Sequence, residues 1–216
     1  MFARTARLLL RPSWPEDAEA LYEAVADEVI VRNLARVPWP YSLDDAKAFA
    51  SRPIQHSKNN AEFLVFRRTH GSPQLIGSCG FIGLENGEIE LGYWIARSHW
   101  GLGFATEATR SVLEIAKTCG HKRIYAEPFV DNPASKHVLQ KLGFRKNGRS
   151  VERYSTGRRK KVLATPLVLE FGESEMCKSD EKGDEPTDPR SRPSSPQKLG
   201  CGTKATLRST LQKLAA

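Results

Sequence analysis

The stretch "SHWGLGFATEATRSVLEIAKTCG", from Ser98 to Gly120, opens with two glycines one residue apart and continues directly into a helical pattern. Gly101 and Gly103 lack a Cβ atom, so the backbone there can approach a ligand closely. The helix that we expect from Thr106 to Lys117 would add unpaired N–H groups and the positive end of its dipole. A glycine turn that leads into a helix N-terminus is typical of a phosphate-binding site.

Three phosphate-binding patterns compete for this turn. The Walker pattern needs Gly-x-x-x-x-Gly-Lys-Ser/Thr, and the sequence contains no such run. The dinucleotide pattern needs a third glycine where Thr106 stands, and parallel βαβ units where this chain has hairpin patterns. The pyrophosphate of coenzyme A fits better, with backbone donors running from Trp100 to Ala105. Taken alone, the turn is equally compatible with a plain strand-to-helix connection.

Hydrophobic periodicity predicts alternating strands and helices before position 171. Ser42, with Asp45 three residues on, predicts a helix N-cap, and Gly143 predicts the C-terminal end of a helix. The strands are expected at 6–12, 61–68, 74–84, 88–96, 123–130, 149–155 and 160–171, and the other helices at 14–27 and 134–144. This order predicts a mixed α+β domain around one sheet.

The composition changes near Phe171. The stretch after it is rich in Pro, Ser, Gly and mixed charge and poor in aromatic residues, so it cannot offset its ordering entropy by burial. We therefore expect a folded domain over residues 1–171 and a disordered tail over 172–216. No apolar run approaches the roughly 18 residues that a membrane-spanning helix needs.

The net charge of +8 suggests an anionic partner. The tail carries eight Lys or Arg against seven Asp or Glu, so the excess belongs to the folded part. The four cysteines show neither a CxxC pair nor a histidine at metal spacing, which predicts reduced thiols, no metal and a cytoplasmic location. Three arginines precede the first acid, which keeps mitochondrial import as an alternative, although "RLLLRP" is better explained as a strand.

A second motif, "VDNPASKHVLQKLGF", spans Val130 to Phe144. Asn132 is well placed as an N-cap, with Pro133 at the first helical position. A capped helix explains both residues fully. It does not explain why this unit follows the glycine-turn helix by one strand.

Together, "IELGYWIARSHWGLGFATEATRSVLEIA" and "VDNPASKHVLQKLGF" resemble the GNAT superfamily of acetyl-CoA-dependent N-acetyltransferases, in particular its RimJ/RimL type, which acetylates ribosomal-protein N-termini and related amines. The resemblance covers roughly residues 4 to 171. It implies a central, mostly antiparallel sheet with splayed fourth and fifth strands, flanked by helices. One departure is Trp100, which stands where the superfamily signature usually has Gln or Arg.

The resemblance also implies a set of site residues. The pantetheine arm would meet main-chain groups of Gly92 and its successors, and Asn132. Ser135 would protonate the coenzyme A thiolate, against the alternative of a solvent-facing serine at a helix start. The residues implied in cofactor binding are Tyr93, Trp94, Ile95, Trp100, Gly101, Leu102, Gly103, Phe104, Ala105 and Asn132. For the aromatic pair Tyr93 and Trp94, simple packing is the alternative.

The general base is the least defined part of the site. Glu88 and Glu90 lie two residues apart on a strand and so share one face. Glu90 is the candidate base, evenly balanced against a solvated sheet face, and Glu88 is assigned to solvent. Glu127 on the next strand is a weaker competitor. A protein α-amine has a pKa of about 7.7–8.0, against about 10.4 for lysine, so a site without a sharp base favours an α-amine.

The implied activity is direct transfer of an acetyl group from acetyl-CoA to a primary amine, and we favour a protein N-terminus as the acceptor. The alternatives are a small amine such as an aminoglycoside, polyamine or amino acid, and a coenzyme A-binding module without turnover. The basic stretch "TGRRKK" at 156–161 could contact ribosomal RNA, but a solvated hairpin tip explains it better. We expect neither a membrane nor a nucleic-acid substrate.

Overall fold

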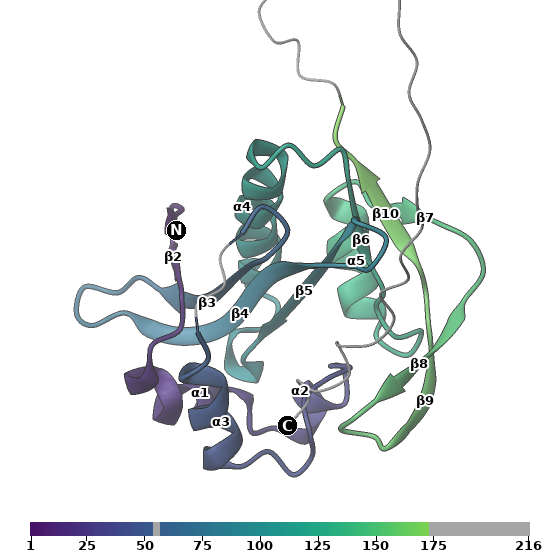
Figure 1. Cartoon of the computed structure of the whole chain (residues 1–216). Helices are drawn as coiled ribbons and strands as arrows, with labels where there is room; N and C mark the ends of the chain where they lie inside the picture. The colour runs from purple at the N-terminus through teal and green to yellow at the C-terminus, as the bar shows by residue number, and fades with distance from the viewer. Residues whose placement is uncertain (54–56, 173–216) are drawn as a thin grey trace, which may run out of the picture. The chain divides into compact units, whose positions relative to one another are not determined.

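The computed structural model describes residues 1–53 and 57–172. An eight-stranded sheet runs in the order β1-β2-β3-β4-β5-β6-β10-β7, and β8 and β9 form a separate hairpin (Figure 1). The strands are β1 Ala3–Arg4, β2 Leu8–Arg11, β3 Ala61–Arg67, β4 Gln74–Gly83, β5 Ile89–Ile95, β6 Arg123–Ala126, β7 Arg145–Lys146, β8 Val151–Ser155, β9 Lys160–Ala164 and β10 Leu167–Glu170. The helices are α1 Ala18–Val25, α2 Glu28–Val31, α3 Leu43–Ala50, α4 Phe104–Thr118 and α5 Pro133–Lys141, with single 3-10 turns at Pro15–Asp17 and Arg97–His99. The mixed α+β class predicted from the sequence is confirmed.

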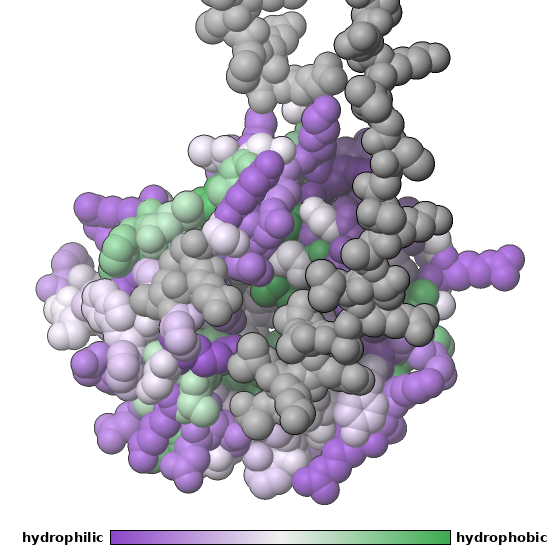
Figure 2. Space-filling model, viewed as in Figure 1, coloured by the Kyte–Doolittle hydropathy of each residue, from purple (hydrophilic) through white to green (hydrophobic). Residues whose placement is uncertain are grey.

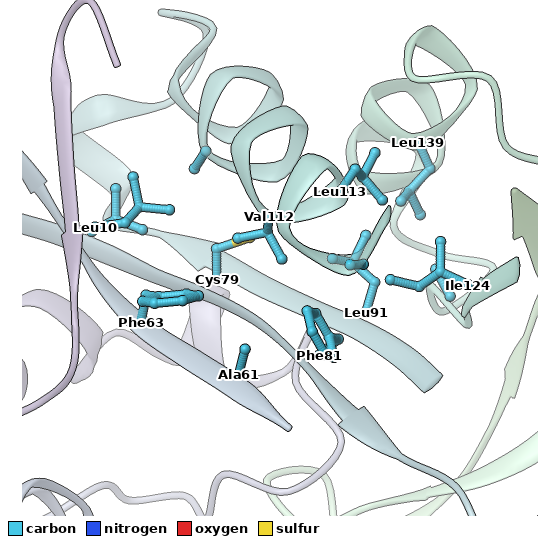
Figure 3. Packing of buried hydrophobic residues seen from close by; sticks show 14 of the residues in the cluster. Leu10, Ala61, Phe63, Cys79, Phe81, Leu91, Val112, Leu113, Ile124 and Leu139 are labelled. Atoms are coloured by element: carbon cyan, nitrogen blue, oxygen red, sulfur yellow. The ribbon is translucent and has the colours of Figure 1, made fainter. Parts of the chain in front are cut away.

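Alternation along the strands produces two cores, one on each face of the sheet. On β3, Phe63 and Val65 join the core under α4 and α5, whereas Leu64 and Phe66 join the core under α1 and α3. Figure 3 shows the first core, in which Phe63, Cys79, Phe81 and Leu91 of the strands meet Val112, Leu113 and Leu139 of the helices. Each side chain of β5 therefore faces one of two separate environments.

The helix termini carry the capping residues that the sequence predicts. Ser42 and Asp45 form a reciprocal capping box at the start of α3. Asn132 caps α5 with Pro133 at the first helical position, and Gly143 follows the helix end with φ 93°. Helix α4, expected from about Thr106, begins two residues earlier, at Phe104, directly after Gly103 with φ 80°.

Other predicted boundaries also change. The single strand expected over 160–171 is two strands, β9 and β10, separated by Thr165 and Pro166. Proline has no N–H to donate to a ladder, and the chain changes sheets there: β9 pairs with β8, and β10 pairs with β6 and β7. Helix α2 and the two-residue strands β1 and β7 were not predicted, since they are too short to show a period.

The sheet contains one parallel junction among the described strands, between β5 and β6, on either side of α4. Their register consists of a single pair, Glu90 opposite Tyr125. On its other edge β5 pairs with β4 without interruption from Ile89 to Ile95. Within the described chain, residues 91–95 thus lack a strand partner on the β6 side, which is the splay that the family resemblance implies.

The face of this unit that Figure 2 shows is mainly polar. Figure 2 shows a face dominated by hydrophilic residues, with only scattered apolar patches. Among the described residues, no helix has the length and apolar character to cross a bilayer, and no three His, Cys, Asp or Glu side chains lie close enough to share a metal ion. The tail predicted from residue 172 onward lies, beyond its first residue, outside the described residues.

A nearly buried ion pair connects β2 to the start of α1. Arg11 donates two hydrogen bonds of 2.7 Å to the Asp17 carboxylate, and these side chains are 12% and 9% exposed. The Arg11 guanidinium also lies between the rings of Trp14, at 3.8 Å, and Phe66, at 4.1 Å. Arg11 therefore depends on one carboxylate for its charge balance.

We predict that Asp17→Ala lowers the free energy of unfolding by about 3–5 kcal/mol, because it leaves the Arg11 guanidinium buried without a counter-ion. Urea unfolding followed by circular dichroism measures the change. Asp44→Ala is the matched control, since Asp44 contacts Lys47 at 3.8 Å with its side chain 94% exposed. If the two substitutions lowered the free energy of unfolding equally, the stabilising role of the Arg11–Asp17 ion pair would be contradicted.

Candidate active site

The glycine turn has the backbone conformation that its sequence suggests. Gly101 and Gly103 have φ values of 75° and 80°, in the left-handed region that side chains disfavour. A Cβ atom built at Gly101 would have nothing within 4 Å, so open space lies in front of the turn. Phe104 and Ala105 form the first turn of α4, where main-chain N–H groups lack intrahelical partners. These features fit the pyrophosphate of coenzyme A.

Trp100 fixes this turn to the end of β5. Its Nε1–H donates a 2.6 Å hydrogen bond to the carbonyl oxygen of Ile95, while the ring remains 46% exposed. From the sequence, Trp100 was a departure from the family pattern and the first of the expected backbone donors, but its main-chain N–H donates to the Arg97 carbonyl oxygen at 3.2 Å. No sequence signal could have revealed its contact, because the bond depends on the 3-10 turn Arg97–His99 that lies between the two residues.

Three of the predicted site residues come together at the opening between β5 and α5. The Tyr93 hydroxyl lies 2.9 Å from Ser135 Oγ and 3.2 Å from the Ser135 carbonyl oxygen. The Ser135 main-chain N–H donates to Asn132 Oδ1 at 3.1 Å. Ser135 is therefore not a free surface serine, and the side-chain Nδ2 of Asn132 makes no hydrogen bond within the described residues, whereas its main-chain N–H donates to the Phe129 carbonyl oxygen at 2.9 Å.

Burial raises the pKa of Tyr93 to about 12, although the hydrogen bond with Ser135 works in the opposite direction. The phenol therefore keeps its proton at neutral pH. Tyr93 packs against side chains of the core under α4, in line with the packing alternative given beside its predicted main-chain contact. Its hydroxyl adds a proton donor that was not expected from the sequence.

The remaining predicted cofactor residues have different environments. Trp94 packs into the core under α1 and α3, and Ile95 is buried under α4, so both offer main-chain groups and not side chains to a ligand. Leu102 is 53% exposed at the tip of the turn, and Phe104 is buried. Gly92 is exposed, and a Cβ there would again meet nothing within 4 Å.

The candidate base Glu90 lies on the face opposite α4, with its carboxylate 3.5 Å from Arg36. Burial raises the pKa of Glu90 above its ordinary value, and Arg36 partly counteracts this effect. Its rivals are held more firmly. Glu127 makes two hydrogen bonds to Arg153, and Glu88 accepts from Tyr125 at 2.8 Å. Glu88, expected on a solvated sheet face, is partly exposed and is also held by Tyr125 and Arg123.

The β8–β9 hairpin packs against the segment that follows α2. A Cβ at Gly157 would lie 2.7 Å from Val31 at the end of α2 and 3.1 Å from the Val37 carbonyl oxygen. The Arg158 side chain is only 10% exposed and donates to Asp131 with bonds of 2.6 and 3.0 Å. The prediction of a solvated hairpin tip at 156–161 is therefore wrong for Arg158. A cavity of about 390 Å³ remains between hairpin and segment, lined by Glu28, Arg32, Trp39, Asp131, Gly157, Arg158 and Lys160.

The sequence matches the acetyltransferase (GNAT) domain family over residues 7–145. It is also 32% identical over 152 residues to the uncharacterized N-acetyltransferase YoaA of Bacillus subtilis (strain 168), a match that covers 67% of this chain and 82% of that protein. The chain belongs to the GNAT acetyltransferase family. It is an acetyl-CoA-dependent N-acetyltransferase, and the RimL-like resemblance seen in the sequence is confirmed.

Solved GNAT structures share the fold. RimL, the ribosomal L7/L12 alpha-N-protein acetyltransferase in complex with coenzyme A, has a TM-score of 0.66 at 19% identity, covering 79% of this chain and 98% of that one. The spermidine N-acetyltransferase from Vibrio cholerae, in complex with CoA and spermine, has a TM-score of 0.62 at 23% identity, covering 77% and 96%. The GNAT fold thus accommodates very different acceptor amines.

The raised pKa of Tyr93 gives a spectroscopic prediction. Replacing Tyr93 by Phe should remove one phenolate step near pH 12 from the ultraviolet difference spectrum, read immediately after a pH jump. In urea, where the chain is unfolded, the titration step that Tyr93→Phe lacks relative to the wild type should instead lie near pH 10, the pKa of an unperturbed tyrosine. Since the unfolded chain releases this proton first, the free energy of unfolding should fall between pH 10 and 12, and fall less in Tyr93→Phe. If folded Tyr93→Phe instead lost a phenolate step near pH 10, the raised pKa of Tyr93 would be contradicted.

Proposed function

We propose that this GNAT protein acetylates the α-amine of a protein or peptide N-terminus. The observation that carries the proposal is the meeting of Tyr93, Asn132 and Ser135 beside the glycine turn, where β5 and β6 separate. The acetyl group comes from the thioester of acetyl-CoA. The protein groups around the opening divide into those that bind the cofactor, those that orient it and those that move a proton.

Binding falls to main-chain groups on either side of the opening. The N–H groups of the glycine turn and the first turn of α4 face the pyrophosphate, where the helix dipole favours negative charge. Asn132 uses Oδ1 to cap α5, so its Nδ2 remains to donate to a carbonyl of the pantetheine arm. The role of Trp100 is to hold the turn on β5.

Proton supply falls to Ser135. Its hydroxyl can donate to the departing thiolate sulfur, and the Tyr93 hydroxyl can then donate to Ser135 Oγ across 2.9 Å. The pKa of about 12 keeps Tyr93 protonated and ready to do so. General acid catalysis of this kind contributes about 10²–10⁴-fold to a rate.

Proton removal from the acceptor amine falls to Glu90. Burial raises the pKa of its carboxyl, which makes the carboxylate a stronger base, and its contact with Arg36 is long. Glu127 is a poorer base because Arg153 occupies both of its oxygens. An α-amine with a pKa of about 7.7–8.0 also needs little assistance.

The charges near the opening favour a peptide over a polycation. The cavity beside the β8–β9 hairpin carries three basic side chains against two acidic ones. On the sheet face, Arg36 and Arg153 offset Glu90 and Glu127. A polyamine or an aminoglycoside would require an excess of acidic groups, whereas an N-terminus carries a single charge. A small amine therefore remains the second candidate.

The deciding experiment measures acetyl-CoA-dependent thiol release with N-terminal peptides, polyamines and an aminoglycoside. We expect turnover with peptides, about a 10²-fold lower kcat in Ser135→Ala, and a raised KM for acetyl-CoA in Asn132→Ala. The matched controls Ser150→Ala and Asn147→Ala change exposed residues outside the site. Turnover with small amines alone would overturn the peptide assignment. Binding of acetyl-CoA without any turnover would overturn the catalytic one.

The pH dependence tests Glu90. Both the amine and its base must be deprotonated, so the logarithm of kcat/KM should fall with slope one below the amine pKa and with slope two below the Glu90 pKa. Glu90→Gln should lower kcat/KM by about 10²-fold and retain slope one throughout. Glu127→Gln is the control that keeps both slopes. An unchanged profile in Glu90→Gln would exclude this carboxylate as the base.

A further inference from the structure

Residues of the N-terminal strand pair β1–β2 contact the start of α4, which lies about a hundred residues later in the chain. Glu107, in the first turn of that helix, accepts hydrogen bonds from Thr5 Oγ1 at 2.6 Å, from the Arg7 main-chain N–H at 3.0 Å and from Arg7 Nε at 2.7 Å. Arg7 Nη2 also lies 2.7 Å from Glu107 Oε2. Four contacts thus hold a single carboxylate, and three of them come from Arg7.

Arg7 also touches the glycine turn directly. Its Nη1 donates a 3.0 Å hydrogen bond to the carbonyl oxygen of Leu102, and its guanidinium lies 4.4 Å over the ring of Phe104. A Cβ atom built on Gly103 would lie 3.6 Å from Nη2. One side chain, itself 48% exposed, therefore contacts Leu102 and Phe104 and lies beside Gly103 between them.

The position of Glu107 creates an electrostatic problem. A carboxylate in the first turn stabilises a helix, but it also opposes the binding of a phosphate to the same N–H groups. Burial would raise the pKa of Glu107, but the hydrogen bonds from Thr5 and Arg7 outweigh this effect and hold the pKa below its ordinary value. Glu107 is therefore charged whenever the turn is in use.

We propose that Arg7 is a positioning residue of the phosphate-binding turn, which cancels the charge of Glu107 so that the turn presents a net positive field to the phosphates of acetyl-CoA. The inference rests on the proposed use of the turn for acetyl-CoA. It assigns the turn between β1 and β2, which lies outside both sequence motifs, to cofactor binding. Glu107 in turn fixes Arg7 on the turn through the contacts with Leu102 and Phe104.

The test compares Arg7→Met with the wild type for two ligands, acetyl-CoA and acetyl-pantetheine, which lacks the phosphates. We expect Arg7→Met to raise the Kd for acetyl-CoA about tenfold at low salt, to raise it less at high salt because exposed charges are screened, and to leave acetyl-pantetheine unchanged. Arg7→Lys, which retains the charge, should recover most of the affinity. Arg4→Met is the control, since it removes an exposed charge from the neighbouring strand.

The double variant Arg7→Met/Glu107→Gln distinguishes compensation from direct contact. It should regain most of the lost acetyl-CoA affinity, because the uncompensated carboxylate is gone. The inference would be overturned if the double variant bound acetyl-CoA as weakly as Arg7→Met does. It would also be overturned if Arg7→Met weakened the binding of acetyl-CoA and acetyl-pantetheine equally. A wild-type protein that binds neither ligand would overturn the acetyl-CoA site itself, whereas normal acetyl-CoA binding by a folded Arg7→Met would overturn only the role of Arg7.

Discussion

The parallel junction between β5 and β6 is the constraint on which the rest of this structure depends. The strands pair at Glu90 and Tyr125 alone, while β4 holds the opposite edge of β5 along its whole length. Backbone groups of a strand must find partners, and at this junction the pairing stops where the site begins. The glycine turn, the start of α4 and the cap of α5 all lie around this opening. In the proposed function, the cofactor takes the place of the missing neighbour of β5.

The two faces of the sheet divide the chemistry. Side chains of β5 alternate, so Tyr93 points toward α5 and Ser135, while Glu90 points toward Arg36 on the other face. The proposed proton donor and proton acceptor, three residues apart on one strand, thus lie on opposite faces of the sheet. That separation suits a transfer in which the thiolate gains a proton on one side and the amine loses one on the other. Burial raises the pKa of both groups, so that the Tyr93 hydroxyl keeps its proton and the Glu90 carboxylate becomes more basic.

Long-range polar contacts hold the loops around this opening. Arg7 ties the N-terminal strand pair to the glycine turn, and Arg158 ties the β8–β9 hairpin to Asp131, one residue before Asn132. Both arginines bind a carboxylate with paired bonds, a geometry that lysine cannot reproduce. Segments distant in sequence are thereby brought to the glycine turn and to the residue before the α5 cap. The excess of basic residues in the folded part has this structural use in addition to any partner.

Local features of the protein could be predicted from the order of its residues: the capping box at Ser42, the Asn132 cap, the left-handed glycines 101 and 103, and the family to which they belong. Such features depend on residues within one turn of each other, so neighbouring side chains are enough to specify them. The folded chain was needed to establish the division of 160–171 at Pro166, the pairing of Tyr93 with Ser135, and the contacts of Arg7 and Arg158. The contacts among these join residues that are tens to a hundred positions apart, and no periodicity or spacing records which distant side chain a folded backbone will bring within hydrogen-bonding distance.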